Sequence, residues 1–204
     1  MLISFPAPSM LYDRIRLASA SPRRSQLLRQ IGVLHDVRPV DLDESRRVRE
    51  SPRDYVLRLA REKAAAGVAL GGDLPVLAAD TTVAIGEEIF GKPQHETDAL
   101  RMLAALAGRS HDVLTAVTLA CEGRQRTSIS ETRVTFRAIS DAERRCYWTS
   151  GEPLDRAGAY AIQGFAAAFI ARLEGSYSGV MGLPLFETAA LLDAAGVRRW
   201  QAET

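Results

Sequence analysis

The sequence predicts an α/β protein built on one mixed, elongated β-sheet flanked by helices. Segments with helical apolar spacing and segments with strand composition follow one another without strict strand–helix alternation, which favours a sheet with both parallel and antiparallel pairs. The segment 126–136 alternates with a period of two, as a strand with one buried face does. A chain of 204 residues can bury a substantial core around such a sheet.

The first predicted elements are a short strand over residues 14–18 and a helix that follows it after a tight turn. Ser21 is a favoured N-cap residue, and Pro22 suits the first helical position. Gly32 follows the last apolar positions of this helix and ends it.

The next predicted elements are a long helix and a buried strand. The sequence from Ser51 to Asp54 is that of a capping box with proline at the first helical position, and the helix runs to Gly71-Gly72. The apolar run 76–85 predicts a strand that turns at Gly86.

The second half of the chain continues this mixture. Thr97 is expected to cap a helix, and Ser140 with Glu143 forms a second capping box. The remaining expected elements are strands over 113–121, 126–136 and 168–173, loops over 151–164 and 175–179, and a last helix over 184–195.

Composition excludes several classes of protein. Apolar residues make up 47% of the chain and charged residues 25%, and the formal net charge of +1 gives no basic field for nucleic acid. Cys121 and Cys146 lack the spacing of a metal or redox motif, and no apolar run is long enough to span a bilayer. We expect a cytoplasmic protein that binds neither nucleic acid nor membrane.

The amino terminus lacks the basic and apolar regions of a signal peptide. We expect residues 1–204 to form a single domain in which residues 1–13 are an N-terminal extension. Met10 lies close to the first strand, so translation starting at Met1 and translation starting at Met10 are both open.

The turn between the first strand and its helix has an unusual charge pattern. Arg23 and Arg24 fall in the first helical turn, where unpaired N–H groups already carry partial positive charge. An anion such as phosphate, bound between the two arginines, explains this arrangement. The alternative is a solvated basic turn.

Asp80 interrupts an otherwise apolar strand. Burying a carboxylate is costly unless it is paired, hydrogen-bonded or metal-bound. A hydrogen bond to a neighbouring hydroxyl such as that of Thr81 is the structural explanation. The functional interpretation is a metal ligand or a general base at a sheet edge, with a pKa raised by its apolar surroundings.

Two further residues are candidates for ligand binding. Lys92 lies between a glycine and a proline that fix its backbone direction, although a solvated loop lysine has the same sequence. Gln163 follows a run of small residues that let a ligand approach the backbone, and its amide can both donate to and accept from a nucleobase edge. Tyr160, in the same loop, is either part of the site or simple core.

Several common motifs are absent from the sequence. There is no phosphate-binding P-loop, no dinucleotide fingerprint and no G-x-S-x-G elbow, which disfavours P-loop ATPases, NAD enzymes and α/β-hydrolases. The histidines show no metal-binding spacing and are expected at the surface or in loops. They are His35, His95 and His111.

Taken together, these segments resemble the Maf family of nucleoside triphosphate pyrophosphatases, from about Arg14 to the last helix. The resemblance is carried by Leu17-Ala18-Ser19-Ala20-Ser21-Pro22-Arg23-Arg24, Arg61-Glu62-Lys63-Ala64, Ala79-Asp80-Thr81, Gly91-Lys92-Pro93, Val134-Thr135-Phe136, Gly158-Ala159-Tyr160-Ala161-Ile162-Gln163-Gly164 and Gly182-Leu183-Pro184-Leu185.

The resemblance implies an enzyme that splits nucleoside triphosphates between the α and β phosphates with the help of Mg²⁺ or Mn²⁺. It also implies a fold like that of inosine triphosphate pyrophosphatase, with two lobes and the nucleotide cleft between them, and a homodimer. The form A-G-A-Y-x-I-Q-G is that of the branch acting on dTTP and UTP, with modified pyrimidine nucleotides left open as substrates.

The resemblance also implies residue roles, carried over by position. Asp80 matches the proton acceptor, and Glu44 and Asp80 are the expected metal ligands, although which carboxylate binds the cation and which takes the proton stays open. The matches to substrate-binding and specificity positions are Arg23, Thr81, Gln163, Ser19, Arg24, Lys63 and Lys92.

Two other functions compete with this one. The first is a pyrophosphatase for non-standard purine nucleotides such as dITP. The second is a nucleotide-binding regulator of septum formation with little catalysis. The presence of Asp80 favours an enzyme, because a protein that only binds a nucleotide needs no proton acceptor.

Overall fold

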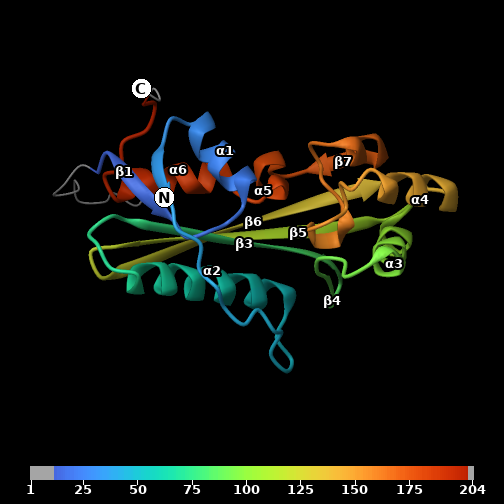
Figure 1. The fold of residues 1–204 in the computed structure, drawn as a ribbon, viewed down its shortest axis with the longest axis horizontal. Coiled ribbons are helices and arrows are strands. Elements are labelled where there is room, and N and C mark those ends of the chain that lie inside the picture. The colour runs from blue at the N-terminus through green and yellow to red at the C-terminus, as the bar shows by residue number, and fades with distance from the viewer. Residues whose placement is uncertain (1–11, 202–204) are drawn as a thin grey trace.

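The computed structural model describes residues 12–201, which fold around a seven-stranded mixed sheet (Figure 1). The strand order is β2-β1-β3-β5-β6-β7, and β4 pairs with β3 outside this path. β1 is parallel to β2 and β3, and the other pairs are antiparallel. The predicted mixed, elongated sheet flanked by helices is confirmed.

The elements have the following bounds. The strands are β1 (Arg14–Leu17), β2 (Leu34–Val37), β3 (Val76–Ile85), β4 (Glu88–Phe90), β5 (Ser110–Cys121), β6 (Arg124–Phe136) and β7 (Ile170–Glu174). The helices are α1 (Pro22–Gln30), α2 (Pro52–Ala69), α3 (Glu96–Leu106), α4 (Asp141–Thr149), the 3₁₀ turns η1 (Ala157–Ala159) and η2 (Phe165–Phe169), α5 (Tyr177–Met181) and α6 (Leu185–Ala194).

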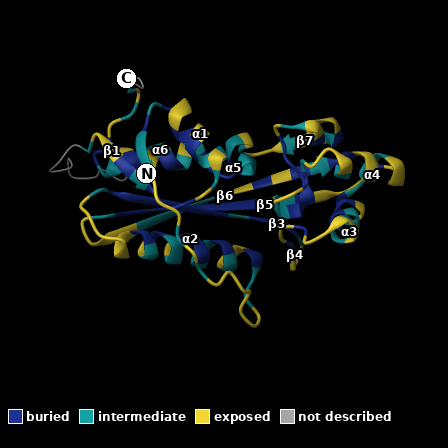
Figure 2. Ribbon diagram, viewed as in Figure 1, coloured by how far each residue is buried: buried dark blue, intermediate teal, exposed yellow. Residues whose placement is uncertain are grey.

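Helices cover both faces of the sheet. Because successive strand residues point to opposite faces, Ala78 packs in the cluster with Ala64 of α2, whereas Leu77 packs in the cluster that includes residues of α1 and α6. In Figure 1, α2 accordingly lies on one side of the long strands, and α1 and α6 lie on the other. Of the long strands between them, β3 and β5 are almost wholly buried, whereas β6 carries several exposed residues (Figure 2).

The two largest apolar clusters lie in different lobes of the molecule. One core gathers around β1, α1 and α6 and includes Ile15, Leu28 and Leu192. The other gathers around α3, α4 and β7 and includes Leu103 and Phe136. The long strands β3, β5 and β6 run through both lobes (Figure 1), and the predicted two-lobed shape is confirmed.

One edge of β3 is open between the lobes. β1 pairs with β3 only up to Leu77, and β4 joins the same strand from Val83 onward. Within the described residues, the segment 78–82 therefore has a strand partner only on its other side, where β5 pairs along its whole length. The gap leaves room for a ligand beside the middle of β3, which is where Asp80 lies.

Several predicted elements have the expected bounds and caps. The strand over 76–85 is β3, and Ser140 and Glu143 form the predicted capping box of α4. Of the capping box predicted at Ser51, one half forms: the Ser51 hydroxyl accepts a hydrogen bond from Asp54 N–H. The Asp54 carboxylate accepts from the Ser51 hydroxyl and not from the Ser51 backbone N–H.

Other expectations are wrong. β2 follows α1 unpredicted, and α5 forms in part of the segment expected to be a loop. The N-cap of α3 is His95 instead of Thr97, because the His95 ring accepts from Asp98 N–H. Ser21 and Pro22 do occupy the predicted N-cap and first helical positions of α1, but the Ser21 side chain makes no capping hydrogen bond.

Most of the expected N-terminal extension, including Met1 and Met10, lies outside the described residues. Its last two residues contact the C-terminal segment: Tyr12 bridges to Val197, and Asp13 forms an ion pair with Arg198. Across residues 12–201, every helix is too short or too polar to cross a membrane.

Candidate active site

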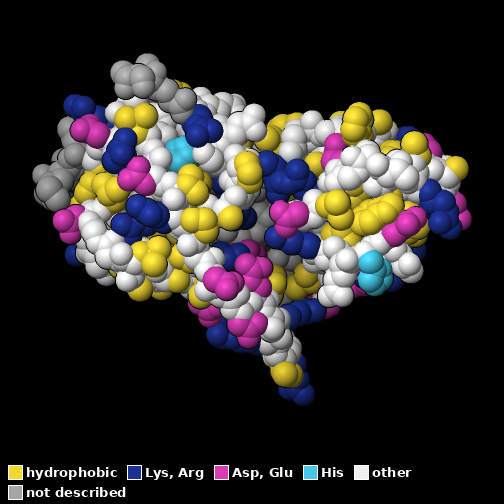
Figure 3. All heavy atoms as spheres, viewed as in Figure 1, with side chains coloured by type: hydrophobic (Ala, Val, Ile, Leu, Met, Phe, Trp, Pro, Cys, Tyr) yellow, Lys and Arg dark blue, Asp and Glu magenta, His cyan; other side chains and the backbone are white. Residues whose placement is uncertain are grey.

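A cavity of about 430 Å³ opens at the free edge of β3, between the two lobes. Figure 3 shows the surface hollowed there, with acidic and basic side chains gathered around the hollow. Every site residue that the sequence singles out lines this cavity. They are Ser19, Arg23, Arg24, Glu44, Lys63, Asp80, Thr81, Lys92 and Gln163.

At the cavity floor, two carboxylates converge on one ammonium. Lys63 Nζ, from the middle of α2, lies 2.7 Å from Asp80 Oδ1 and 2.6 Å from Glu44 Oε1. Asp80 is 7% exposed, whereas half of the Glu44 side chain faces solvent. Burial raises the pKa of Asp80, against the opposing effect of Lys63 and Arg24, which suits this carboxylate to accepting a proton.

The same two carboxylates fit the expected divalent cation in donor chemistry. Mg²⁺ prefers oxygen ligands and is usually held by one or two carboxylates together with substrate phosphates. No cluster of three or more acidic, histidine or cysteine ligands occurs between residues 12 and 201, so the chain alone offers only a partial coordination shell. A cation bound by Glu44 and Asp80 would take oxygens that now contact Lys63.

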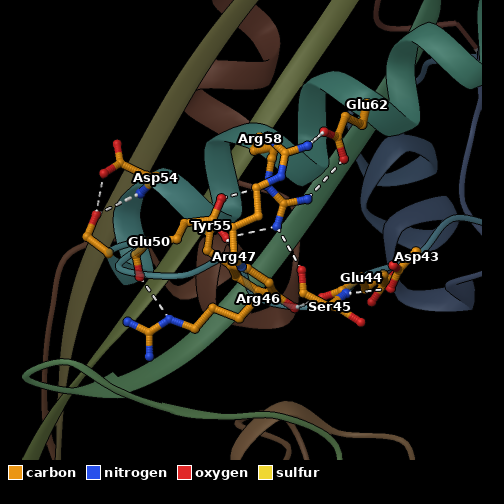
Figure 4. Close-up of polar contacts among 11 residues, drawn as sticks. Asp43, Glu44, Ser45, Arg46, Arg47, Glu50, Asp54, Tyr55, Arg58 and Glu62 are labelled. Atoms are coloured by element: carbon orange, nitrogen blue, oxygen red, sulfur yellow. Dashed lines mark hydrogen bonds and ion pairs between the residues drawn. The ribbon is translucent and has the colours of Figure 1, made fainter.

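A network of ion pairs holds the loop that carries Glu44 (Figure 4). Arg58, on α2, donates from Nε and Nη2 to the two carboxylate oxygens of Glu50 at 2.6 and 2.8 Å, and from Nη1 to Glu62 at 3.0 Å. Arg58 also donates to the Ser45 carbonyl, and the Tyr55 hydroxyl donates to the Glu44 carbonyl at 2.9 Å. The loop is therefore fixed at the Glu44 carbonyl and at the residue that follows it.

Arg23 and Arg24 connect α1 to the segment around α5. Arg23 Nε donates to the Met181 carbonyl at 3.3 Å, and Arg24 Nε donates to the Gly182 carbonyl at 2.9 Å. Arg24 also donates to the Ser19 hydroxyl at 3.0 Å. Both arginines are partly buried, so the solvated basic turn is excluded, and their remaining donors are available at the cavity wall.

Asp80 and Thr81 point to opposite faces of β3. Asp80 faces α2 through Lys63, while the Thr81 hydroxyl lies 3.5 Å from Arg24 Nη2 and 3.0 Å from the Thr115 hydroxyl. A purely structural pairing of Asp80 with the Thr81 hydroxyl is therefore not what this structure shows. The cavity reaches both side chains because β3 has no neighbour at this edge.

The far wall of the cavity comes from the second lobe. Lys92 Nζ forms an exposed ion pair with Asp155 at 2.5 Å. The N–H of Gly158 donates to the Gly91 carbonyl at 3.0 Å, which joins the segment after β4 to the turn η1. Gly158 has φ +68° and packs against Val83, so a side chain there would be strained and crowded.

Gln163 projects from a turn that Glu152 holds. The Glu152 carboxylate accepts from Phe165 N–H at 2.8 Å, from Ala166 N–H at 3.2 Å and from the Tyr147 hydroxyl at 2.8 Å. Gly164 lies directly against this carboxylate and leaves no room for a side chain. The backbone after Gln163 is thereby fixed, while the Gln163 side chain is exposed in the cavity.

Tyr160 and His111 form a buried pair beside the site. Tyr160 lines the cavity, and its hydroxyl lies 2.9 Å from His111 Nε2. The expectation of a surface His111 is wrong: β5 begins three residues earlier than predicted and places this ring inward, at 2% exposure. Burial lowers the pKa of His111 to about 4, so the imidazole is neutral near pH 7.

Comparison with known sequences decides the family. The sequence model of the family described as Maf-like protein matches residues 14–195, which is most of the chain. The chain belongs to the Maf family. All the residues that line the cavity lie within the segment matched by the family model.

This Maf protein is similar in sequence to proteins named dTTP/UTP pyrophosphatase. The dTTP/UTP pyrophosphatase of Bordetella parapertussis is 54% identical over 193 residues, covering 90% of this chain and 93% of that protein. The dTTP/UTP pyrophosphatase of Saccharophagus degradans is 52% identical over 189 residues, covering 91% and 90% of the two chains. The Staphylococcus aureus Ham1 protein overlaps at a TM-score of 0.41 and 14% identity, covering 63% of this chain and 72% of that one, too distant to bear on fold or activity.

Two polar residues illustrate what the sequence did not predict about this cavity. Tyr55 contributes the hydroxyl that holds the Glu44 loop, and Arg156 contributes a further cation. Tyr55 occupies an ordinary helical position and gives no local signal. Arg156 directly precedes the sequence Ala157-Gly158-Ala159-Tyr160. A basic residue next to this motif could have indicated its place in the cavity.

Proposed function

We propose that this Maf protein hydrolyses dTTP and UTP to the nucleoside monophosphate and pyrophosphate. The observation that carries the proposal is the buried Asp80 at a free strand edge, surrounded by the cations of a cavity between two lobes. Relatives at 50–54% identity over about nine-tenths of the chain bear the name dTTP/UTP pyrophosphatase. Modified pyrimidine nucleotides are included among the proposed substrates.

Asp80 is assigned to the proton and Glu44 to the cation. Burial raises the pKa of Asp80, and the half-exposed Glu44 can present its carboxylate to solvent-borne ions. A bound Mg²⁺ or Mn²⁺ would screen charge on the phosphate oxygens. Asp80 takes the proton from a water whose oxygen forms a bond to the α-phosphorus, while the bond from that phosphorus to the α–β bridging oxygen breaks and pyrophosphate leaves.

The cations around the cavity suit the triphosphate chain. Arg24 and Lys63 lie beside Asp80, Arg23 lies at the α1 wall, and Lys92 lies across the cleft. Arginine forks and lysine ammonium groups neutralise phosphate oxygens through charge-assisted hydrogen bonds. Lys63 and Lys92 form ion pairs with carboxylates in this structure. When substrate binds, its phosphates would replace these carboxylates as the partners of the two ammonium groups.

Base choice is assigned to Gln163, with Arg23 and Thr81 nearby. In the part of the chain that the structure describes, the Gln163 amide has no hydrogen-bond partner, so both its donor and its acceptor are free for the O4/N3 edge of uracil or thymine. A site that needs those bonds rejects bases that cannot form them, because its own polar groups stay unpaired.

A substrate panel tests the proposal. Pyrophosphate release is measured from dTTP, UTP, dITP and 7-methyl-GTP, with Mg²⁺, with Mn²⁺ and with a chelator. We expect metal-dependent release, fastest from dTTP and UTP. Faster release from dITP or 7-methyl-GTP would move the protein to a purine-specific function, and nucleotide binding without release would favour the septum regulator. The homodimer is part of the proposal and is measured by sedimentation velocity on the same preparation.

A further inference from the structure

Arg156 lines the cavity from the second lobe, yet no part of the reaction described above uses it. It precedes η1 in an extended conformation, and its carbonyl accepts from Ala159 N–H at 3.0 Å. The Gly158–Gly91 hydrogen bond ties this segment to the residue before Lys92. Arg156 and Lys92 therefore belong to one joined edge of the cleft, across from Arg23 and Arg24.

The Arg156 guanidinium lacks a partner. Between residues 12 and 201, no carboxylate or carbonyl accepts a hydrogen bond from it, and its Nε is buried without any acceptor. The other two cavity arginines differ, because Arg23 and Arg24 donate to the carbonyls of Met181 and Gly182. Burial lowers the pKa of Arg156, and no nearby acid opposes that effect. A partly desolvated cation in this state costs stability unless something else compensates it.

The acids of the cavity do not supply that compensation. Asp80 and Glu44 both contact Lys63, and Asp155, the residue next to Arg156 in sequence, contacts Lys92. Arg156 is thus a cation without a hydrogen-bond acceptor among residues 12–201, whereas each of the other cavity cations contacts a carboxylate or a backbone carbonyl. An anionic ligand bound in the cavity would provide the missing acceptors.

We propose that Arg156 is a substrate-binding residue that contacts the phosphate tail of a nucleoside triphosphate. The inference rests on the proposed function and adds to it a contact from the second lobe. The guanidinium presents its donors in a planar fork that matches two phosphate oxygens, which an ammonium group cannot do. The tail would then be held from both sides of the cleft.

Binding of inorganic pyrophosphate tests this contact directly. Isothermal titration calorimetry compares the wild type with Arg156→Gln, Arg156→Lys and the control Arg124→Gln. Arg124 is an exposed arginine at the start of β6, outside the cavity, and its substitution makes the same change in net charge. We expect Arg156→Gln to weaken pyrophosphate binding by roughly 10- to 100-fold, as loss of a charge-assisted hydrogen bond does. The pyrophosphate affinity of Arg156→Lys should lie between those of the wild type and Arg156→Gln. The affinity of Arg124→Gln should match that of the wild type.

Thermal unfolding separates binding from a structural contribution. Removing an unpaired, desolvated cation should leave the Tm of Arg156→Gln unchanged or higher, since no intramolecular hydrogen bond is lost. A lower Tm together with unchanged pyrophosphate affinity would assign Arg156 to the fold and overturn the inference. Equal weakening in Arg124→Gln would also overturn it, because the effect would then reflect overall charge.

The outcome is independent of the activity assay. If the wild type releases no pyrophosphate from dTTP, the proposed function fails, while a selective loss of pyrophosphate affinity in Arg156→Gln still supports an anion-binding Arg156. If the wild type hydrolyses dTTP and Arg156→Gln retains both its pyrophosphate affinity and its KM for dTTP, the proposed function stands and this inference fails.

Discussion

Helix α2 carries two ionic clusters of similar composition, each made of two carboxylates and one cation. In the cavity, Glu44 and Asp80 share Lys63. One loop away, Glu50 and Glu62 share Arg58 (Figure 4). The first cluster uses a point charge and leaves carboxylate oxygens open to the cavity, whereas the second uses a planar fork and places Arg58 and Glu50 at 12% and 8% exposure.

Because of this difference in geometry, the Lys63 cluster can exchange its ionic partners more easily than the Arg58 cluster. Arg58 donates from three nitrogens to two acids and a carbonyl, so any rearrangement breaks several bonds at once. Lys63 makes one contact to each acid, and substrate phosphates or a cation can replace these contacts one at a time. Similar charges thus hold a loop in the Arg58 cluster, whereas the Lys63 cluster is the one proposed to take part in the reaction.

The largest effect on activity is expected from a substitution of Asp80, the buried carboxylate of the Lys63 cluster. Asp80→Asn keeps the shape of the side chain and removes the proton acceptor, so kcat for pyrophosphate release should fall roughly 10²- to 10⁴-fold. The KM for dTTP should change little, because the phosphate-binding cations remain. Steady-state kinetics measure both constants, and near-normal kcat in this variant would remove Asp80 from catalysis.

The Arg58 cluster should contribute mainly to the free energy of unfolding. Arg58→Met leaves Glu50 buried without its cation, and breaking a buried pair in this way costs about 3–5 kcal/mol of unfolding free energy. Urea unfolding followed by circular dichroism measures the loss. Arg47→Gln is the matched control, because Arg47 pairs with Glu62 at the surface and should cost less than about 1 kcal/mol. Similar losses in both variants would contradict the distinction between the clusters.

Acid should impair both clusters, but over different pH ranges, because the two carboxylate pKa values are shifted in opposite directions. Arg58 holds the pKa of Glu50 at about 2, so the stability that this carboxylate provides is present above its ordinary pKa of 4.5 and is lost as pH falls toward 2. The pKa of Asp80 is raised, so kcat/KM should rise with pH through a value above the ordinary aspartate range.

Two pH series measure these responses. Unfolding between pH 6 and 3 should lose less stability in Glu50→Gln than in the wild type, because the variant has no carboxylate there to protonate. The profile of kcat/KM against pH gives the acid limb assigned to Asp80. A wild-type acid limb at or below the ordinary aspartate pKa would contradict the raised value.

The smallest effect is expected at the link between the clusters. Burial raises the pKa of Tyr55 to about 12, so its hydroxyl stays protonated near pH 7 and donates to the Glu44 carbonyl. Tyr55→Phe removes this single bond and should cost about 1 kcal/mol, or roughly fivefold in kcat/KM. Tyr12→Phe is the control, since the Tyr12 hydroxyl contacts Glu122 outside the cavity. No difference between the two variants would show that Glu44 is held without Tyr55.

Local patterns account for what the sequence predicts well. The apolar run of β3 and the capping box of α4 depend on neighbouring residues, and both have the expected bounds. β2 has four residues, all partly or fully exposed, so it lacks a strong apolar pattern. α5 has only five residues and contains a glycine, which lowers helical propensity.

For the site, residue membership was predictable but pairing was not. All the predicted site residues line the cavity, because the elements and turns that carry them were placed correctly. Their partners come from distant parts of the chain: Arg23 and Arg24 reach carbonyls 158 residues away, and Lys63 reaches Asp80 across 17 residues. Contacts of this kind depend on tertiary packing, which no local window contains.

The long ladder of β5 and β6 has a mechanical consequence for the enzyme. The two strands pair without interruption from Ser110 to Cys121, and β6, with 13 residues, spans roughly 40 Å at the usual rise per residue. Both lobes are attached to this pair of strands, and the β5–β6 ladder runs between them without interruption. The two walls of the cleft therefore share one continuous β ladder as their common support.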